Sequence, residues 1–86
     1  MKYTVEYEPE AVVNLGNMTL VVRERIAKKI EWLAENLDQI MPQQLTGNLA
    51  GYYKLRVGDY RVIYDFISEE KVLIIYKIGH RSEIYG

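Results

Sequence analysis

Apolar and polar residues alternate along two short segments, residues 52–57 and 60–66, on either side of Gly58 and Asp59. Alternation is typical of half-buried β-strands, because successive strand side chains point to opposite faces of a sheet. A two-residue loop that begins with glycine favours a type II′ turn, whose twist matches that of paired strands. The pattern therefore predicts a β-hairpin whose apolar face carries Tyr53, Leu55, Val57, Tyr60, Val62, Tyr64 and Phe66.

The first half of the chain predicts one strand and two helices. Residues 2–8 alternate like a half-buried strand, and Pro9 then suits the first turn of a short helix that Gly16 and Asn17 close. The apolar residues that follow recur at helical spacing, which predicts an amphipathic helix capped by Thr19 or Asn17. Its buried stripe is Val22, Ile26, Ile30, Leu33 and Leu37, with Trp32 at the flank of the core.

The second half predicts a long connection and a central strand. Residues 38–51 lose the periodicity, and we expect Leu45 and Leu49 to pin this segment to the core. Residues 71–78 are apolar on both parities, which indicates a central strand that ends at Gly79. Unbroken alternation turns Val72, Ile74, Tyr76 and Ile78 toward the helices and leaves Leu73 and Ile75 on the other face. A substrate, a partner or the chain end is then expected to cover that face.

The order of these elements indicates an α+β fold in a single domain, residues 1–86. We expect a small antiparallel-rich sheet with two N-terminal helices packed on one face, in the order β-α-α-β-β-β. The absence of cysteine excludes a disulfide framework, and with only one histidine the chain also lacks the ligands of a structural zinc site. No cofactor is expected. The chain contains no run of about 18 apolar residues, so no membrane span is predicted. A cytoplasmic location fits this composition.

The charge of the chain is nearly balanced, with 11 Lys and Arg against 12 Asp and Glu. Since nucleic-acid binding modules are often strongly basic, any contact with nucleic acid is expected to be local. If the apolar hairpin residues face the core, Lys54, Arg56 and Arg61 emerge together on the opposite face, where they suit a phosphate group. The plainer interpretation is that these cations keep a half-exposed sheet soluble.

The end of the chain adds candidates to this cationic face. His80 and Arg81 follow the central strand, and Tyr85 can return to the same place. Together, the hairpin and the Gly-His-Arg ending resemble the RelE/ParE superfamily of bacterial and archaeal type II toxins. The resemblance covers nearly the whole chain, through residues 3–7, Ala11 and residues 45–47, 53–64 and 78–85.

The superfamily holds two functional classes, and the resemblance favours one of them. RelE-like members are ribonucleases that cut messenger RNA in the ribosomal decoding site, whereas ParE-like members poison DNA gyrase. The basic and aromatic set of this chain is similar to that of the nuclease class. It implies a catalytic site formed by Lys54, Arg56, Arg61, His80, Arg81 and Tyr85. A gyrase poison, or an inactive relative that only binds an antitoxin, is the alternative.

The resemblance also implies a metal-independent cleavage in which the 2′-hydroxyl of the RNA attacks the phosphorus. Such a reaction needs help to deprotonate the nucleophile, to stabilise charge on the phosphate and to protonate the leaving oxygen. We place Lys54 or Arg56 near the nucleophile and Arg61 on the phosphate oxygens. His80 or Arg81 is placed near the leaving oxygen, and the Tyr85 ring would stack on or orient a base.

The expected partners are the ribosome with its message and a RelB-like antitoxin, which neutralises such toxins in a hetero-oligomer. Two features depart from the family pattern. The chain is nearly neutral where many relatives are basic, so we expect weak binding to free RNA. It also stops at Gly86 where many relatives continue into a further helix, which is expected to leave the cationic face less shielded.

Overall fold

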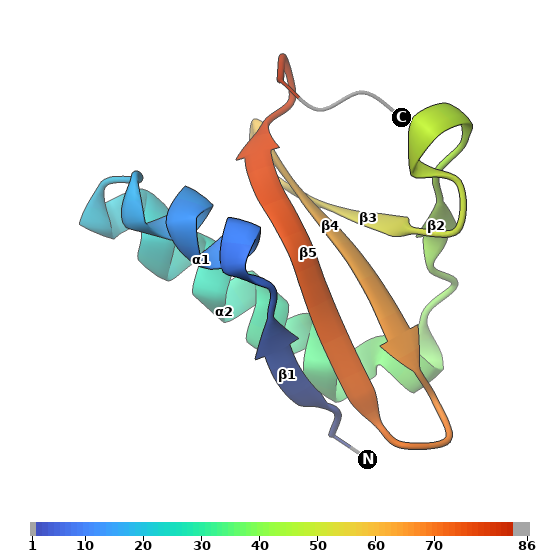
Figure 1. Ribbon diagram of the computed structural model, residues 1–86. Helices are drawn as coiled ribbons and strands as arrows, with labels where there is room; N and C mark the ends of the chain where they lie inside the picture. The colour runs from blue at the N-terminus through green and yellow to red at the C-terminus, as the bar shows by residue number, and fades with distance from the viewer. Residues whose placement is uncertain (1, 84–86) are drawn as a thin grey trace.

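The structure, a computed structural model, describes residues 2–83. Its helices and strands are β1 (Thr4–Tyr7), α1 (Pro9–Gly16), α2 (Leu20–Asn36), β2 (Gln43–Gln44), β3 (Tyr53–Val57), β4 (Tyr60–Ile67) and β5 (Val72–His80). Two short 3-10 helices, η1 (Leu37–Gln39) and η2 (Gly47–Leu49), flank β2. The predicted α+β fold is confirmed (Figure 1). The connection also contains β2, a strand that the sequence pattern did not predict.

The strands form one sheet in the order β1-β5-β4-β3-β2. β1 runs parallel to β5, and the other neighbouring pairs are antiparallel. In Figure 1, α2 crosses behind the sheet and α1 lies beside β5. Both helices contribute to the same core cluster, so the prediction that they pack on one face of the sheet is confirmed. We call the face that they cover the helix face, and the other one the open face.

The helices begin and end where the sequence predicts. Pro9 lies in the first turn of α1, and Asn17 follows the last residue of that helix. Thr19 caps α2, because its Oγ1 accepts a hydrogen bond of 3.4 Å from the backbone N–H of Val22. Within residues 2–83, no helix has the length and apolar character needed to cross a membrane.

The main core lies between α2 and the helix face. The predicted stripe of α2 supplies Ile26, Ile30 and Leu33, whose side chains have no exposed surface. They join Val62 and Tyr64 of β4 in one cluster. Burying one such aliphatic side chain contributes about 1.5–3 kcal/mol, so this stripe holds the helix on the sheet.

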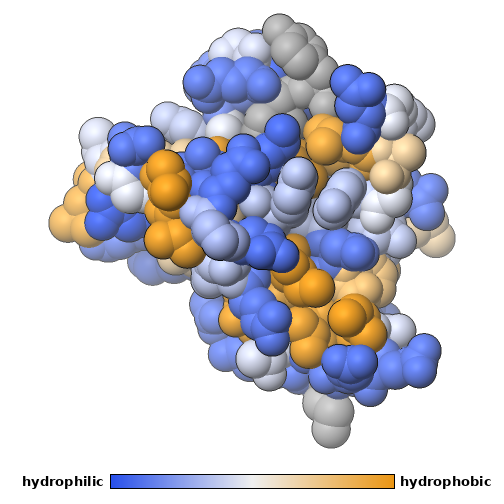
Figure 2. Space-filling view, in the orientation of Figure 1, coloured by the Kyte–Doolittle hydropathy of each residue, from blue (hydrophilic) through white to orange (hydrophobic). Residues whose placement is uncertain are grey.

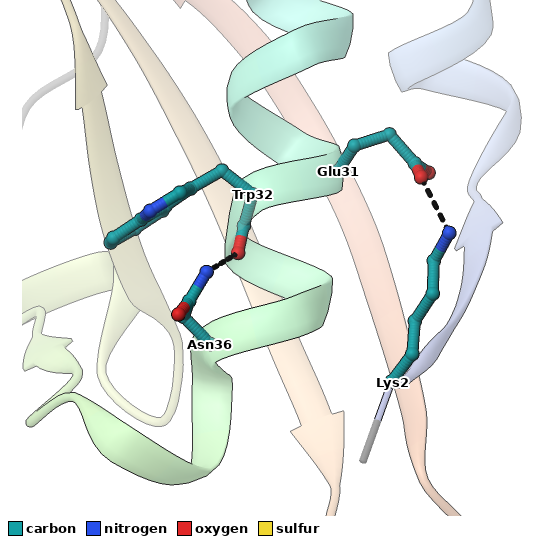
Figure 3. Close-up of polar contacts among 4 residues, drawn as sticks. All are labelled: Lys2, Glu31, Trp32 and Asn36. Carbon is teal, nitrogen blue, oxygen red and sulfur yellow. Dashed lines mark hydrogen bonds and ion pairs between the residues drawn. The ribbon is translucent and has the colours of Figure 1, made fainter.

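Trp32 lies outside the core, which corrects its predicted place. Its side chain is 41% exposed, and Lys29 Nζ lies 4.0 Å from the ring centroid. Trp32 precedes Leu33 of the buried stripe by one residue, and one residue turns about 100° around a helix. Figure 3 shows the ring pointing away from the side of α2 on which Glu31 pairs with Lys2 at 2.7 Å.

A polar cluster joins three segments at one end of the core. The Tyr3 hydroxyl donates to Asp38 Oδ1 at 2.8 Å, and Lys71 Nζ lies 2.6 Å from Asp38 Oδ2. The hydrogen bond from Lys71 is the main cause that holds the pKa of Asp38 below its usual value of 3.8. Burial is the main cause that raises the pKa of Tyr3. The cluster therefore ties the start of β1 to η1 and to the β4–β5 turn.

The β3–β4 hairpin forms in the predicted register. Gly58 has φ of +59°, and Val57 pairs with Tyr60 across the two-residue loop. A positive φ at the first loop residue is what a type II′ turn requires, and glycine adopts it without strain. Arg56 pairs with Arg61, and the apolar residues pair with one another. The predicted separation of apolar and cationic positions onto two faces is confirmed.

A β-bulge interrupts the alternation in β5. Ile63 of β4 pairs with Lys77, but the next residue, Tyr64, pairs with Ile75. Tyr76 is therefore an extra residue in the ladder between β4 and β5. One extra residue reverses the parity of the strand on one side of the bulge, because strand side chains alternate with a period of two.

The bulge overturns part of the predicted placement of the central strand. Leu73 and Ile75 have no exposed surface and lie in the main core, so their predicted position on the cationic face is wrong. The helix-facing placement predicted for Val72, Ile74 and Tyr76 is also wrong, whereas that of Ile78 is confirmed. The strand also does not end at Gly79, since β5 continues to His80.

A smaller apolar cluster lies on the open face. Leu45 and Ile63 are buried there, and Leu49, Tyr52 and Tyr76 pack against them. The segment that contains β2 and η2 therefore folds over part of this face, as the prediction for Leu45 and Leu49 requires. Figure 1 shows this segment at the edge of the sheet next to β3.

Candidate functional site

Cationic side chains form two rows across the open face. In the first row, Lys54 of β3 lies opposite Ile63 of β4, which lies opposite Lys77 of β5. In the second row, Arg56 lies opposite Arg61, which lies opposite Gly79. The rows are two residues apart along the strands, or roughly 7 Å. The predicted trio Lys54, Arg56 and Arg61 is thus brought together on one rigid surface.

The three hairpin cations differ in how exposed their side chains are. Arg56 is exposed, and its Nε donates to the backbone carbonyl of Gly58 at 3.4 Å. Lys54 and Arg61 are half-buried. Because the backbone of both strands is fixed by the sheet ladder, the strand positions from which these side chains extend are set before any ligand arrives. Such preorganisation strengthens the recognition of a phosphate group.

His80 lies on the other face of the sheet from these cations. It pairs with Tyr60, and its ring contacts the Tyr60 ring edge-on with centroids 5.6 Å apart. Tyr60 packs against the main core, so both rings belong to the helix face. The Nδ1 atom of His80 accepts a hydrogen bond of 3.2 Å from the backbone N–H of Ser82, which leaves Nε2 as the protonated nitrogen of the neutral ring.

A polar hollow of about 280 Å³ lies beside His80, between the end of β5 and the segment formed by the last turn of α1 and the α1–α2 turn. The backbone N–H of His80 donates to Glu83 Oε1 at 3.0 Å, which folds the segment after β5 back over the strand end. The hollow and the cation rows open on different faces. It is lined by Asn14, Asn17, Met18, Tyr60, Ile78, Gly79, His80 and Glu83.

Arg81 continues the ladder beyond β5. Its backbone N–H donates to the carbonyl oxygen of Asp59 at 2.8 Å, and its side chain is exposed. Alternation from Gly79 assigns Arg81 to the parity of Arg61, which is that of the open face. Tyr85, the last predicted site residue, lies outside the described residues.

The sequence analysis missed Lys77 and Tyr76 on the open face. Lys77 reaches this face because the bulge makes it, as well as Tyr76, oppose Ile63. A strand that is apolar on both parities gives no sign of a bulge in its sequence. Only the pairing of β5 with β4 shows which face these residues occupy. The neighbouring Tyr52 is stacked on Tyr76, with ring centroids 4.7 Å apart.

The arrangement is suited to binding and stabilising a phosphate group. The open face combines the side chains of Lys54, Arg56, Arg61 and Lys77 with aromatic rings. Among residues 2–83, no group of acidic, histidine or cysteine side chains is placed to hold a metal ion. To a phosphate group, this face offers the positive charges of its lysines and arginines.

Comparisons with known proteins agree with this geometry. A family model for the ParE toxin of the type II toxin-antitoxin system parDE matches residues 5–85. The chain is also 31% identical over 89 residues to the mRNA interferase toxin RelE of Escherichia coli strain K12. That alignment covers 100% of this chain and 93% of the relative.

Solved structures show the same fold. The toxin–antitoxin complex RelBE2 from Mycobacterium tuberculosis contains a chain that matches with a TM-score of 0.82 and 23% identity, over 94% of this chain and 100% of that one. At this identity the match is evidence for the fold alone. The archaeal RelE–RelB complex from Pyrococcus horikoshii OT3 matches with a TM-score of 0.75 and 27% identity, over 98% of this chain and 100% of that one.

Proposed function

The chain belongs to the RelE/ParE superfamily of toxins from type II toxin–antitoxin systems, and we propose that it cuts messenger RNA on the ribosome. The observation that carries this proposal is the pair of cation rows on the open face, formed by Lys54, Arg56, Arg61 and Lys77. A protein that acts only by binding gyrase does not need an ordered set of cations on one face of the sheet. The relative at 31% identity is named as an mRNA interferase, which supports the same branch.

The proposed reaction is attack of the RNA 2′-hydroxyl on the adjacent phosphorus, without a metal ion. The 2′-hydroxyl loses its proton and the bond to the 5′-oxygen breaks. One product then carries a 2′,3′-cyclic phosphate, and the 5′-oxygen takes up a proton to give a 5′-hydroxyl on the other. Arg61 lies in the middle of the second row, and in this proposal its guanidinium stabilises the non-bridging oxygens. Lys54 or Arg56 would lie nearest the attacking oxygen. Guanidinium groups are very weak acids, so the arginines stabilise charge rather than transfer protons.

His80 and Arg81, the two candidates for the residue near the leaving oxygen, lie in different positions. Arg81 shares the parity of the open face, whereas the His80 ring lies on the helix face with Tyr60. The geometry therefore supports Arg81 as the residue near the leaving oxygen. Stacking of Tyr85 on a base stays a prediction, since Tyr85 lies outside the described residues.

We also propose that a RelB-like antitoxin neutralises this toxin in the cytoplasm. Solved relatives are toxin–antitoxin complexes. Leu73 and Ile75 cannot form the docking surface, because they are buried in the main core. Exposed apolar side chains lie instead on α1 and at the start of α2, where Figure 2 shows apolar atoms gathered at one end of the molecule. They are Val12, Val13, Leu20 and Val21, which are 56–77% exposed.

The alternative function is that of a DNA gyrase poison. The observation that favours it is the family model, which describes ParE toxins and matches residues 5–85. The two functions predict different targets, so one cell-free assay separates them. A gyrase poison leaves translation of a linear, pre-made message unaffected, whereas an mRNA interferase shortens that message.

The test is in vitro translation of a pre-made message with and without the protein, followed by mapping of the message ends. We expect new ends within codons, formed only when ribosomes translate the message. Arg61→Ala should slow cleavage on the order of 10²–10³-fold, the usual effect of removing one charge-stabilising group. Intact message in the presence of folded protein would contradict the proposal.

Lys28→Ala is the matched control for Arg61→Ala. Lys28 is an exposed cation of α2, which packs on the helix face and so lies across the sheet from the cation rows. Both variants remove one positive charge, so a general loss of attraction to RNA would weaken them equally. Circular dichroism should show that both fold. Equal loss of activity in the two variants would mean that the open face has no special role.

A further inference from the structure

Tyr52 and Tyr76 form a stacked aromatic pair on the open face. Their ring centroids are 4.7 Å apart and their planes differ by 15°. Both side chains are half-buried, so each ring retains exposed surface. Tyr52 directly precedes β3, and Tyr76 lies in β5. The fold therefore brings together two rings that are 24 positions apart in the sequence.

The bulge in β5 lets Tyr76 and its neighbour Lys77 lie on the same face of the sheet. Regular alternation would put one of these two adjacent residues on the helix face. A bulge disrupts the hydrogen bonds of the ladder locally. Bulges are common next to functional sites, where they change the direction of a side chain. Below the rings, Leu45 and Ile63 are each at most 4% exposed and form a rigid floor.

Cations flank this aromatic pair. Ile63 lies under the rings, and its partners across the sheet are Lys54 on one side and Lys77 on the other. Fixed cations beside an exposed aromatic surface are the combination with which proteins bind single-stranded nucleic acid. The cations take the phosphates and the rings take an unstacked base.

We propose that the Tyr52–Tyr76 pair is a stacking platform for a base of single-stranded messenger RNA bound to the open face. This inference rests on the proposed function, because it assigns a further substrate contact to the same face. Every base has a flat aromatic surface, so the platform accepts all four bases. Its contribution is to hold and position the message beside the cation rows, and Tyr52 and Tyr76 are positioning residues.

The competing explanation is that the two rings only cover Leu45 and Ile63. A cover would be replaced well by another large apolar side chain, whereas a stacking platform requires a flat ring. Tyr76→Leu and Tyr76→Phe therefore separate the two roles. Both replacements keep apolar bulk over Ile63, and only phenylalanine keeps the ring. Tyr52→Leu is a second variant, and it leaves β5 and its bulge unchanged.

The first measurement is single-turnover cleavage of one message programmed on ribosomes, over a range of enzyme concentrations. We expect Tyr76→Leu to raise the half-saturating concentration about tenfold and to change the maximal rate less than threefold. Tyr76→Phe should match the parent. Trp32→Leu is the control, because it removes an exposed aromatic ring from α2 outside the open face. A Tyr76→Leu variant that is folded and saturates like the parent would overturn the proposal.

A second measurement tests the platform independently of cleavage. Short single-stranded RNA and a matched RNA with one abasic position are titrated into the parent and Tyr52→Leu at low salt, with fluorescence anisotropy as the readout. We expect the parent to prefer the RNA with the complete set of bases, and Tyr52→Leu to lose most of that preference. Equal binding of both RNAs by the parent overturns the platform even if the message is cut. The preference without cleavage overturns only the ribonuclease assignment.

Discussion

The two faces of the sheet each carry a pair of stacked tyrosines, and the surroundings of the pairs are opposite. On the helix face, the ring centroids of Tyr53 and Tyr64 are 5.7 Å apart, and Tyr64 is 1% exposed. Burial, with a smaller effect of Tyr53, raises the pKa of Tyr64 to about 12. On the open face, Tyr52 and Tyr76 are closer together and retain exposed surface. The same residue type therefore serves the core on one face and remains available to a ligand on the other.

The difference arises from what covers each face. α2 places Ile26, Ile30 and Leu33 against the helix face, whereas the open face is covered only in part, by Leu45 and Leu49. A change to a buried side chain is therefore expected to act mainly on stability, and the more so on the fully covered helix face. A change to an exposed side chain of the open face is expected to act mainly on activity.

The largest expected effect on stability comes from Ile30→Ala in the main core. Ile30 has no exposed surface, and such truncations cost about 2–5 kcal/mol of unfolding free energy. Ile63→Ala removes an equally buried side chain from the smaller open-face cluster, where the cavity can collapse more easily. We expect its cost to lie at the lower end of that range. Chemical denaturation of both variants measures the difference, and a larger loss for Ile63→Ala would contradict this ranking of the two faces.

The next comparison concerns two adjacent residues that belong to different faces. Arg81→Ala is expected to slow cleavage on ribosomes at least about tenfold, because the guanidinium lies on the parity of the cation rows. His80→Ala is expected to change the rate less than about threefold, because the ring packs on Tyr60. Single-turnover rates at saturating enzyme measure both effects. A greater loss for His80→Ala would show that the chain end rearranges when the message binds.

The smallest effect is expected from Asp38→Asn, and it depends on pH. The pKa of Asp38 is lowered in the folded protein, chiefly by the hydrogen bond from Lys71. The resulting stability is fully present above the unfolded pKa of about 3.9 and is lost as the pH falls through the folded pKa. The parent should therefore be more stable than Asp38→Asn at pH 6, and the difference should shrink below pH 4.

Urea denaturation from pH 6 to pH 3 measures this difference. Glu31→Gln is the control, since it also removes one exposed carboxylate that forms an ion pair, here with Lys2 (Figure 3). Its pair lies at the surface, with both side chains 54% exposed, and such pairs contribute little. If Asp38→Asn keeps a constant deficit down to pH 3, its effect arises from packing rather than from ionisation.

The sequence by itself determined the local structure of this protein. The turn at Gly58 fixed the hairpin register, and this register brought Lys54, Arg56 and Arg61 to one face. The spacing of the apolar residues also determined α2 and its buried stripe. These features depend on neighbours within a few residues, so the residue pattern specifies them directly.

Only the tertiary structure decided the faces of β5. Residues 71–78 are apolar on both parities, so a shift of one residue in pairing leaves the pattern unchanged while it exchanges the two faces. The pairing with β4 introduced the bulge at Tyr76, buried Ile75 and brought Lys77 to the open face. It also fixed His80 opposite Tyr60. These outcomes depend on contacts between distant segments, whose energies choose between registers that the local sequence allows equally.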